Sequence, residues 1–236
     1  VQEYVKSIEG FKKISYAFSS KNKGLASSII DGINSVIYEY GKAIVVEDDL
    51  ELMPNFLSFM NQGLIFYENK KDVMSICGHS CKVKVPLDYS YDAYFFTFFS
   101  SWGWGTWSSR WSSVDWYLKD WDSVERNKKA FIKSQGSDVF KMLKDWKNGE
   151  NNSWAIRFCY AQFVQNKLSV IPNISLVDNK GFKGNGTNCR KYSRFKFELN
   201  DNKDNIIFRF PKKVCLNQFI YKQALWYHSI PLRIWS

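Results

Sequence analysis

The sequence has few of the residues that stabilise small disulfide-linked or metal-dependent folds. Its 236 residues include five cysteines, two histidines and five prolines. An odd number of cysteines without a Cys-x-x-Cys pair favours reduced thiols in a cytoplasmic protein over a disulfide framework. The two histidines, His79 and His228, complete no zinc-ligand spacing. The fold therefore depends on an apolar core, which a chain of this length can supply.

Long apolar runs are also missing. No stretch approaches the roughly 20 residues that a membrane-spanning helix needs. No secretory signal follows Val1, and because the sequence does not begin with Met we expect it to be a fragment. Hydrophobic residues make up 45% and charged residues 24%, which excludes intrinsic disorder. No linker is evident, so we expect one domain over residues 1–236.

Acidic residues are outnumbered by basic ones, 23 to 33, giving a net charge of +10. This excess indicates an anionic partner (nucleic acid, a membrane surface or a phosphorylated substrate) or a solvated basic surface. Lysine outnumbers arginine and occurs in scattered pairs, which argues against a dedicated nucleic-acid reader. Ten Trp, 13 Tyr and 19 Phe are available to stack on sugars or bases, or to fill the core.

The first half of the chain predicts an α/β fold. Residues 13–19 alternate apolar and smaller side chains, as a strand does. Residues 24–40 show helical spacing and end at Gly41. The short β-branched run at 43–46 is typical of a buried parallel strand. Strand, helix and strand predict a βαβ unit, and hence an open, mostly parallel sheet flanked by helices.

Further elements follow along the chain. Pro54 opens the next helix. The patterns then predict a strand at 73–77, strand-like residues at 84–100, helices at 124–147 and 154–164, short strands at 168–171 and 174–177, and a polar loop at 178–205. The tail at 214–235 mixes lysine with Phe, Ile, Leu and Trp. This tail either packs against the sheet or makes a peripheral contact with a membrane surface.

The most informative feature is the run Val45-Val46-Glu47-Asp48-Asp49-Leu50. Three carboxylates follow an apolar strand, at the end where open α/β sheets bind ligands. Adjacent carboxylates raise one another's pKa unless a cation lies among them. Mg²⁺ and Mn²⁺ choose oxygen ligands and bridge to phosphate oxygens. The run predicts a divalent cation shared with a nucleotide diphosphate; alternatively, Asp48 or Asp49 caps the following helix.

These residues resemble a known family. The ordered segments resemble the nucleotide-sugar half of A-type glycosyltransferases, closest to N-acetylglucosaminyltransferase I and bacterial polysaccharide-cluster sugar transferases. The segments that carry the resemblance are Asn22-Lys23-Gly24-Leu25-Ala26, the acidic run through Glu51, Pro54-Asn55-Phe56, Ser101-Trp102-Gly103-Trp104-Gly105-Thr106-Trp107, Ser153-Trp154-Ala155-Ile156-Arg157 and Asn179-Lys180-Gly181-Phe182 with Gly186-Thr187. They cover roughly residues 10–190.

The resemblance implies a Rossmann-like fold with a nucleotide-sugar half at about 1–82, an acceptor half at about 83–190 and a C-terminal extension at 191–236. The first βαβ unit of the family has no counterpart here. Asp49 would bind Mn²⁺ or Mg²⁺ held by the donor diphosphate. Asp48 would lie near the ribose and donor sugar, and Glu47 near the nucleotide. Asn22 and Gly24 belong to the donor-binding set.

Other candidates lie in the later segments. Arg157 would contact phosphate, or form an ion pair on its helix. The cluster around Trp102 and Trp104 would form a platform for the acceptor sugar, or pack in the core. Lys183 and Arg190 would close over the diphosphate as a lid, or remain solvated. Asn188 replaces a histidine that bacterial relatives often carry.

The general base is not evident from the motifs. In N-acetylglucosaminyltransferase I it is an Asp just after a Trp, whereas Trp154 is followed here by Ala155 and Ile156. Glu150 and Asp178, from neighbouring loops, are the candidates, with solvated loop acids as the alternative. His79 is expected to be structural.

Together these features predict a metal-dependent, inverting glycosyltransferase. It would move a hexosyl or N-acetylhexosaminyl group from a nucleotide diphosphate sugar, most simply a UDP-sugar, to a hydroxyl of a glycan or lipid-linked acceptor. We expect it to act in the cytoplasm, at or near the inner membrane face, in bacterial surface polysaccharide synthesis. The alternatives are a nucleotidyltransferase and a non-enzymatic carbohydrate- or nucleic-acid-binding module.

Overall fold

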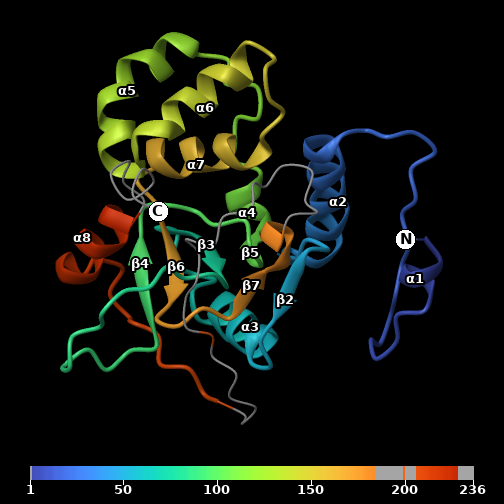
Figure 1. Cartoon of the computed structure of the whole chain (residues 1–236), viewed down its shortest axis with the longest axis horizontal. Helices are drawn as coiled ribbons and strands as arrows, with labels where there is room; N and C mark the ends of the chain where they lie inside the picture. The colour runs from blue at the N-terminus through green and yellow to red at the C-terminus, as the bar shows by residue number, and fades with distance from the viewer. Residues whose placement is uncertain (1, 184–198, 200–205, 228–236) are drawn as a thin grey trace.

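The computed structural model describes residues 2–183, 199 and 206–227. Figure 1 shows a central sheet surrounded by helices. The sheet has five strands in the order β1-β5-β3-β6-β4, and a separate ribbon pairs β2 with β7. The strands are β1 (Lys42–Val45), β2 (Leu50–Leu52), β3 (Val73–Cys77), β4 (Ala93–Phe96), β5 (Trp104–Trp107), β6 (Leu168–Pro172) and β7 (Val177–Asn179). The chain therefore has an α/β fold with a mixed sheet.

The prediction of a mostly parallel sheet is wrong. Only β3 and β6 pair in parallel, whereas β1–β5, β3–β5 and β4–β6 are antiparallel. Two of these antiparallel pairs involve β5, which lies between β1 and β3 and runs against both, and the third is formed by β4 at the other edge. Residues 104–107 were not predicted as a strand. A Cβ on Gly105 would lie 2.9 Å from the Ala43 carbonyl oxygen, so glycine permits this close pairing.

The predicted strand at 13–19 is not formed in the structure, and with it the βαβ unit is lost. After α1 (Gln2–Lys6), the chain is irregular as far as α2. Figure 1 shows this segment standing apart, beside α2. Ile14, Tyr16 and Phe18 remain 36–45% exposed because no neighbouring strand covers them. The Lys13 ammonium contacts the Glu39 carboxylate at 3.4 Å, near the end of α2. β1 is consequently an edge strand.

Most of the predicted helices are confirmed. The helices are α2 (Leu25–Tyr40), α3 (Phe56–Phe66), α4 (Ser108–Trp111), α5 (Trp121–Gln135), α6 (Ser137–Lys147), α7 (Trp154–Val164) and α8 (Gln218–Tyr227), with a short 3₁₀ helix η1 (Lys180–Lys183). Gly136 divides the predicted helix at 124–147 into α5 and α6. Among the described residues, no helix has both the length and the apolar character needed to cross a bilayer.

The core has one apolar cluster on each face of the sheet. One cluster joins the sheet to α2, α5, α7 and α8, and the other joins it to α3 and the segment at 206–216. Trp104 of β5 is fully buried in the first cluster and stacks on Trp154, with 5.2 Å between ring centroids. This contact fixes the start of α7 against the start of β5. Four cysteines (Cys77, Cys81, Cys159 and Cys215) are free thiols, and Cys189 lies outside the described residues.

Two glycines allow a measurement of how tightly the loop before β5 is packed. Gly103 has φ +60°, and a Cβ there would lie 2.7 Å from Phe56 Cε2. Gly149 has φ +77° but has open space around it. We expect Gly103→Ala to lower the free energy of unfolding by about 3 kcal/mol, from backbone strain plus overpacking. Gly149→Ala should cost about 1 kcal/mol from strain alone. Urea unfolding measures both, and equal losses would contradict the close packing.

Candidate functional site

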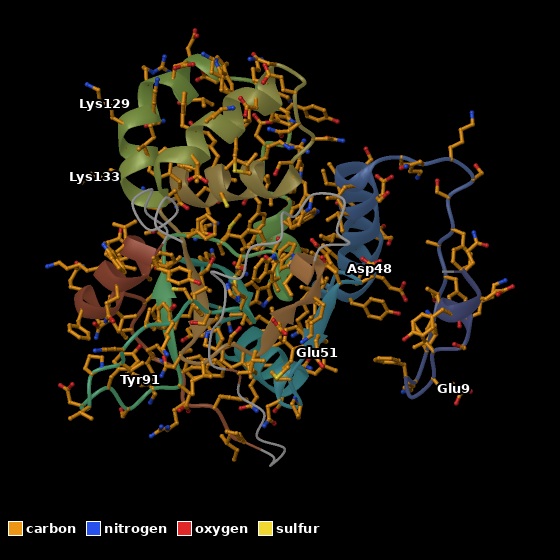
Figure 2. The ribbon with its side chains drawn as sticks, viewed as in Figure 1. Glu9, Asp48, Glu51, Tyr91, Lys129 and Lys133 are labelled. Carbon is orange, nitrogen blue, oxygen red and sulfur yellow. The ribbon has the colours of Figure 1, made fainter. Side chains whose placement is uncertain are left out.

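The candidate site is built on the carboxyl ends of β1 and β3. Val45 of β1 and Cys77 of β3 both lie opposite Trp104, at the start of β5. The acidic run therefore leaves β1 at the edge where Gly78 and His79 leave β3. This arrangement agrees with the prediction that the carboxylates follow a strand end. Figure 2 shows Asp48 beside the lower end of α2 and Glu51 beside β2.

A two-stranded ribbon joins the acidic run to the polar loop that follows β7. β2 and β7 are antiparallel, with Glu51 directly opposite Asp178. Like charges in this position repel. The Lys180 ammonium contacts both carboxylates, and these contacts raise the pKa of Lys180. One lysine thus neutralises part of the repulsion and holds the ribbon together.

The ribbon fixes the position of Asp49. The Lys180 N–H donates to the Asp49 carbonyl oxygen at 2.8 Å. Gly181 lies so close to the Asp49 carboxylate that a Cβ on it would overlap Oδ2. The other oxygen, Oδ1, is buried and has no hydrogen-bond partner among the described residues. An unsatisfied buried carboxylate oxygen is costly, so Oδ1 is available to accept a ligand.

The pKa of Glu47 reflects the crowding of these carboxylates. Partial burial raises the pKa of Glu47, and the charges of Asp49 and Asp48 raise it further. Ionising Glu47 therefore costs more than ionising a free glutamate. A cation among the three carboxylates would relieve both causes.

These residues fit a divalent cation, provided that the substrate or water supplies most of its ligands. Asp49 offers an unsatisfied carboxylate oxygen, the donor type that Mg²⁺ and Mn²⁺ prefer. Within residues 2–183, 199 and 206–227, no three His, Cys, Asp or Glu side chains converge to enclose a metal ion. The donor set is therefore of the open kind, in which Mg²⁺ retains waters or binds substrate phosphate.

Three other predicted residues lie near the starts of α2 and α7. The Gly24 N–H donates to Asn22 Oδ1 at 2.8 Å, just before α2. A Cβ on Gly24 would lie 3.5 Å from Asn152, in the loop before α7. Glu150 lies in that loop, is exposed and accepts from Asn148 Nδ2 at 3.3 Å. These contacts bring the two helix starts together but do not by themselves link them to Asp49.

The structure corrects the role predicted for Arg157. Its side chain is buried in the packing of α7 at 6% exposure. Nη1 donates to the Trp116 carbonyl oxygen at 2.8 Å, and Nε to that of Ser153 at 3.1 Å. The guanidinium also lies over the ring of Trp146. Because Nε and Nη1 both donate to backbone carbonyl oxygens, Arg157 braces α7.

The two tryptophans of the predicted acceptor platform behave differently. Trp104 is fully buried, so it belongs to the core and offers no face to a sugar. Trp102 is half-buried and packs on the His79 ring, with 4.5 Å between centroids. Trp102 alone therefore remains available as an aromatic surface near the strand ends.

One residue of this region, Lys180, was missed in the sequence. His79, which was expected to be structural, lies directly after β3, is 7% exposed and has its Nδ1 3.4 Å from Ser175 Oγ. Lys180 was named only as part of a motif. Its role depends on the pairing of β2 with β7, which a local sequence pattern does not reveal. Lys183 ends η1, whereas Asn188 and Arg190 lie outside the described residues.

Comparison with known proteins adds no further constraint. No protein-family model matches this chain. No curated protein matches it at a significant level. The glycosyltransferase resemblance therefore rests on the sequence motifs alone.

The raised pKa of Glu47 predicts how the stability of the fold depends on pH. Because the folded-state pKa of Glu47 is raised, the folded state binds this proton more readily than the unfolded chain. Stability therefore falls as pH rises from about 4.3 through the raised pKa. Glu47→Gln removes this loss, and we expect it to raise Tm by about 2 °C at neutral pH.

The difference between Glu47→Gln and the wild type should disappear at pH values below about 3, where the carboxyl is protonated in both states. Thermal unfolding of the two proteins across this range measures it. A difference in Tm that stays constant with pH would show that the ionisation of Glu47 is not responsible.

Proposed function

We propose that this chain is a divalent-metal-dependent glycosyltransferase that uses a nucleotide diphosphate sugar. The observation that carries the proposal is the buried, unpartnered Oδ1 of Asp49 at the carboxyl end of β1, beside Glu47 and Asp48. A carboxylate cluster to which no described residue supplies a counter-cation suits a ligand that arrives as a cation–diphosphate pair. The ordered motifs quoted above support the same reaction.

Each described residue has a separate task in this proposal. Asp49 would hold Mn²⁺ or Mg²⁺ through Oδ1, with Asp48 and Glu47 facing the sugar and nucleotide side. When bound, the cation supplies Lewis-acid stabilisation of the departing diphosphate. Lys180 neutralises Glu51 and Asp178, which keeps the ribbon closed beneath Asp49. Trp102 offers an aromatic face for a sugar ring.

A general base must remove the proton of the acceptor hydroxyl in an inverting reaction. Of the two candidates, Asp178 is the better placed, because it lies on the ribbon strand next to the one that follows Asp49. It would act after its contact with Lys180 is broken. Glu150 lies in the loop before α7, beside the start of that helix.

The finer features of the proposal follow the resemblance. The fold would be a variant of the A-type glycosyltransferase fold, with donor binding by residues 1–82 and acceptor binding by 83–190. The donor would be a UDP-sugar, and the acceptor a glycan or a lipid-linked saccharide. The reaction would take place in the cytoplasm, at or near the inner membrane face, during bacterial surface polysaccharide synthesis.

Asp49→Asn tests the metal role. We expect this substitution to weaken Mn²⁺-dependent UDP binding by about 100-fold or more, because the amide replaces an anionic ligand. Calorimetric titration of UDP in the presence of Mn²⁺, and hydrolysis of UDP-sugars, measure the loss. Asp145→Asn on α6 is the matched control and should bind as the wild type does.

The proposal fails if the wild-type chain binds UDP, TDP and GDP no better with Mn²⁺ than without it. It also fails if Asp49→Asn leaves a metal-dependent affinity unchanged. Binding of a nucleoside triphosphate with release of pyrophosphate would instead identify a nucleotidyltransferase.

Gly181→Ala tests the ribbon contact independently. Its added methyl group would overlap Asp49 Oδ2 and displace the carboxylate. We expect Mn²⁺-dependent UDP affinity to fall roughly 10- to 100-fold, as for disturbed metal-ligand orientation. The thermal stability should change little, because Oδ1 leaves an unfavourable buried position. An unchanged affinity would show that the position of Asp49 does not depend on Gly181.

A further inference from the structure

The last described helix, α8, has one face fixed to the core. Ile220 and Ala224 are fully buried. Tyr221 packs on Phe96 of β4, with 5.8 Å between ring centroids. Figure 1 shows α8 at the margin of the molecule beside β4. The described part of the tail therefore does pack against the sheet, with this face of α8 turned to the core.

The opposite face of α8 is open and aromatic. Phe219 is 55% exposed and Trp226 is 63% exposed, with the exposed Lys222 between them. Their spacing of three and four residues places these side chains on one stripe of the helix. A helix that only closes a core would carry polar residues in this stripe. The two aromatic rings therefore indicate a contact outside the chain.

Basic and apolar residues lie next to this stripe. The Gln223 side chain bonds both the N–H and the carbonyl of Lys84, at 2.9 and 3.0 Å, so the loop at 82–88 adjoins α8. Lys82 and Lys84 are exposed there, and Leu87 projects fully into solvent. Asp88 is the one acidic residue in this loop. The projecting side chains of this surface are thus apolar, and lysines surround them.

Further positive charge comes from the end of α5. Thr97, next to β4, donates to the Ser134 carbonyl oxygen at 2.8 Å, so this end of α5 lies at the same end of β4 as Phe96 and α8. Lys133 and Lys129 are exposed on α5, and Figure 2 places them on the side of the molecule where α8 lies.

We propose that the outer stripe of α8, together with the loop at 82–88, lies on an anionic lipid surface. Aromatic and leucine side chains enter the headgroup boundary, while lysines extend to anionic headgroups. This charge complementarity distinguishes a membrane from the other partners. A nucleic-acid surface would favour arginine and would have no use for a projecting leucine. Two rings and one leucine also offer little area for a stable protein interface.

The lipid surface is separate from the candidate donor site. α8 borders β4, whereas the acidic run leaves β1, and these strands form opposite edges of the five-stranded sheet. Substitutions on α8 should therefore leave Mn²⁺ and UDP binding unchanged. The two proposals can fail independently.

Sedimentation of the full chain with lipid vesicles tests the proposal. We expect binding to vesicles of phosphatidylglycerol and phosphatidylcholine, and not to phosphatidylcholine alone, with binding that weakens as salt rises. Phe219→Ser combined with Trp226→Ser should lower the partition coefficient by about tenfold. The matched control combines Tyr38→Ser and Tyr117→Ser, which remove two rings that are 95% and 76% exposed elsewhere. The control should bind as the wild type does.

A charge reversal provides a second variant. Lys222→Glu should lower binding to anionic vesicles by about tenfold, whereas Lys144→Glu on α6 should have less effect. The proposal is overturned if the wild-type chain does not sediment with anionic vesicles, or if the aromatic pair can be removed without loss. It is also overturned if the chain is a dimer without lipid and the α8 substitutions make it monomeric.

Discussion

Repulsion among carboxylates at the end of β1 is the constraint on which the rest of the site depends. Glu47, Asp48 and Asp49 are consecutive, and the pKa of Glu47 is raised by burial and by both neighbours. Glu51 and Asp178 add a second pair of like charges, which Lys180 holds together. Among the described residues, Lys180 forms ion pairs with two of these five carboxylates, and Asp49 Oδ1 has no hydrogen-bond partner. Part of the negative charge of this cluster is therefore not balanced by a contact within the described part of the chain.

The surrounding packing explains how such a cluster can persist. Trp104 of β5 is paired with both Val45 and Cys77, and it stacks on Trp154 in the core. Gly78 and Gly103 fit against Phe56 and Val177, which leaves the strand ends little freedom to separate. Because these contacts are apolar and close, the strand ends beside the acidic run are held in place.

The sequence predicted the local elements better than their arrangement. The spacing in α2, the apolar face of α7 and the acidic run after β1 are local properties, and the structure has them where they were expected. The direction of β5 and the pairing of β2 with β7 depend on contacts between distant residues, so neither could be read from periodicity. The same limit explains why the ligand-binding roles predicted for Arg157 and Trp104 differ from their places in the structure. Both residue types suit ligands, but burial within α7 and β5 gives them structural roles here.

The charge distribution also links the binding of the metal to the binding of the nucleotide in the proposed reaction. The chain as a whole carries a net charge of +10, which attracts a nucleotide diphosphate from solution. The local cluster at Asp49 is negative and would repel the same diphosphate at close range. A divalent cation removes this conflict, because it can bind Asp49 and the phosphate oxygens together. Metal and nucleotide binding should therefore be strongly coupled, and each ligand alone should bind weakly.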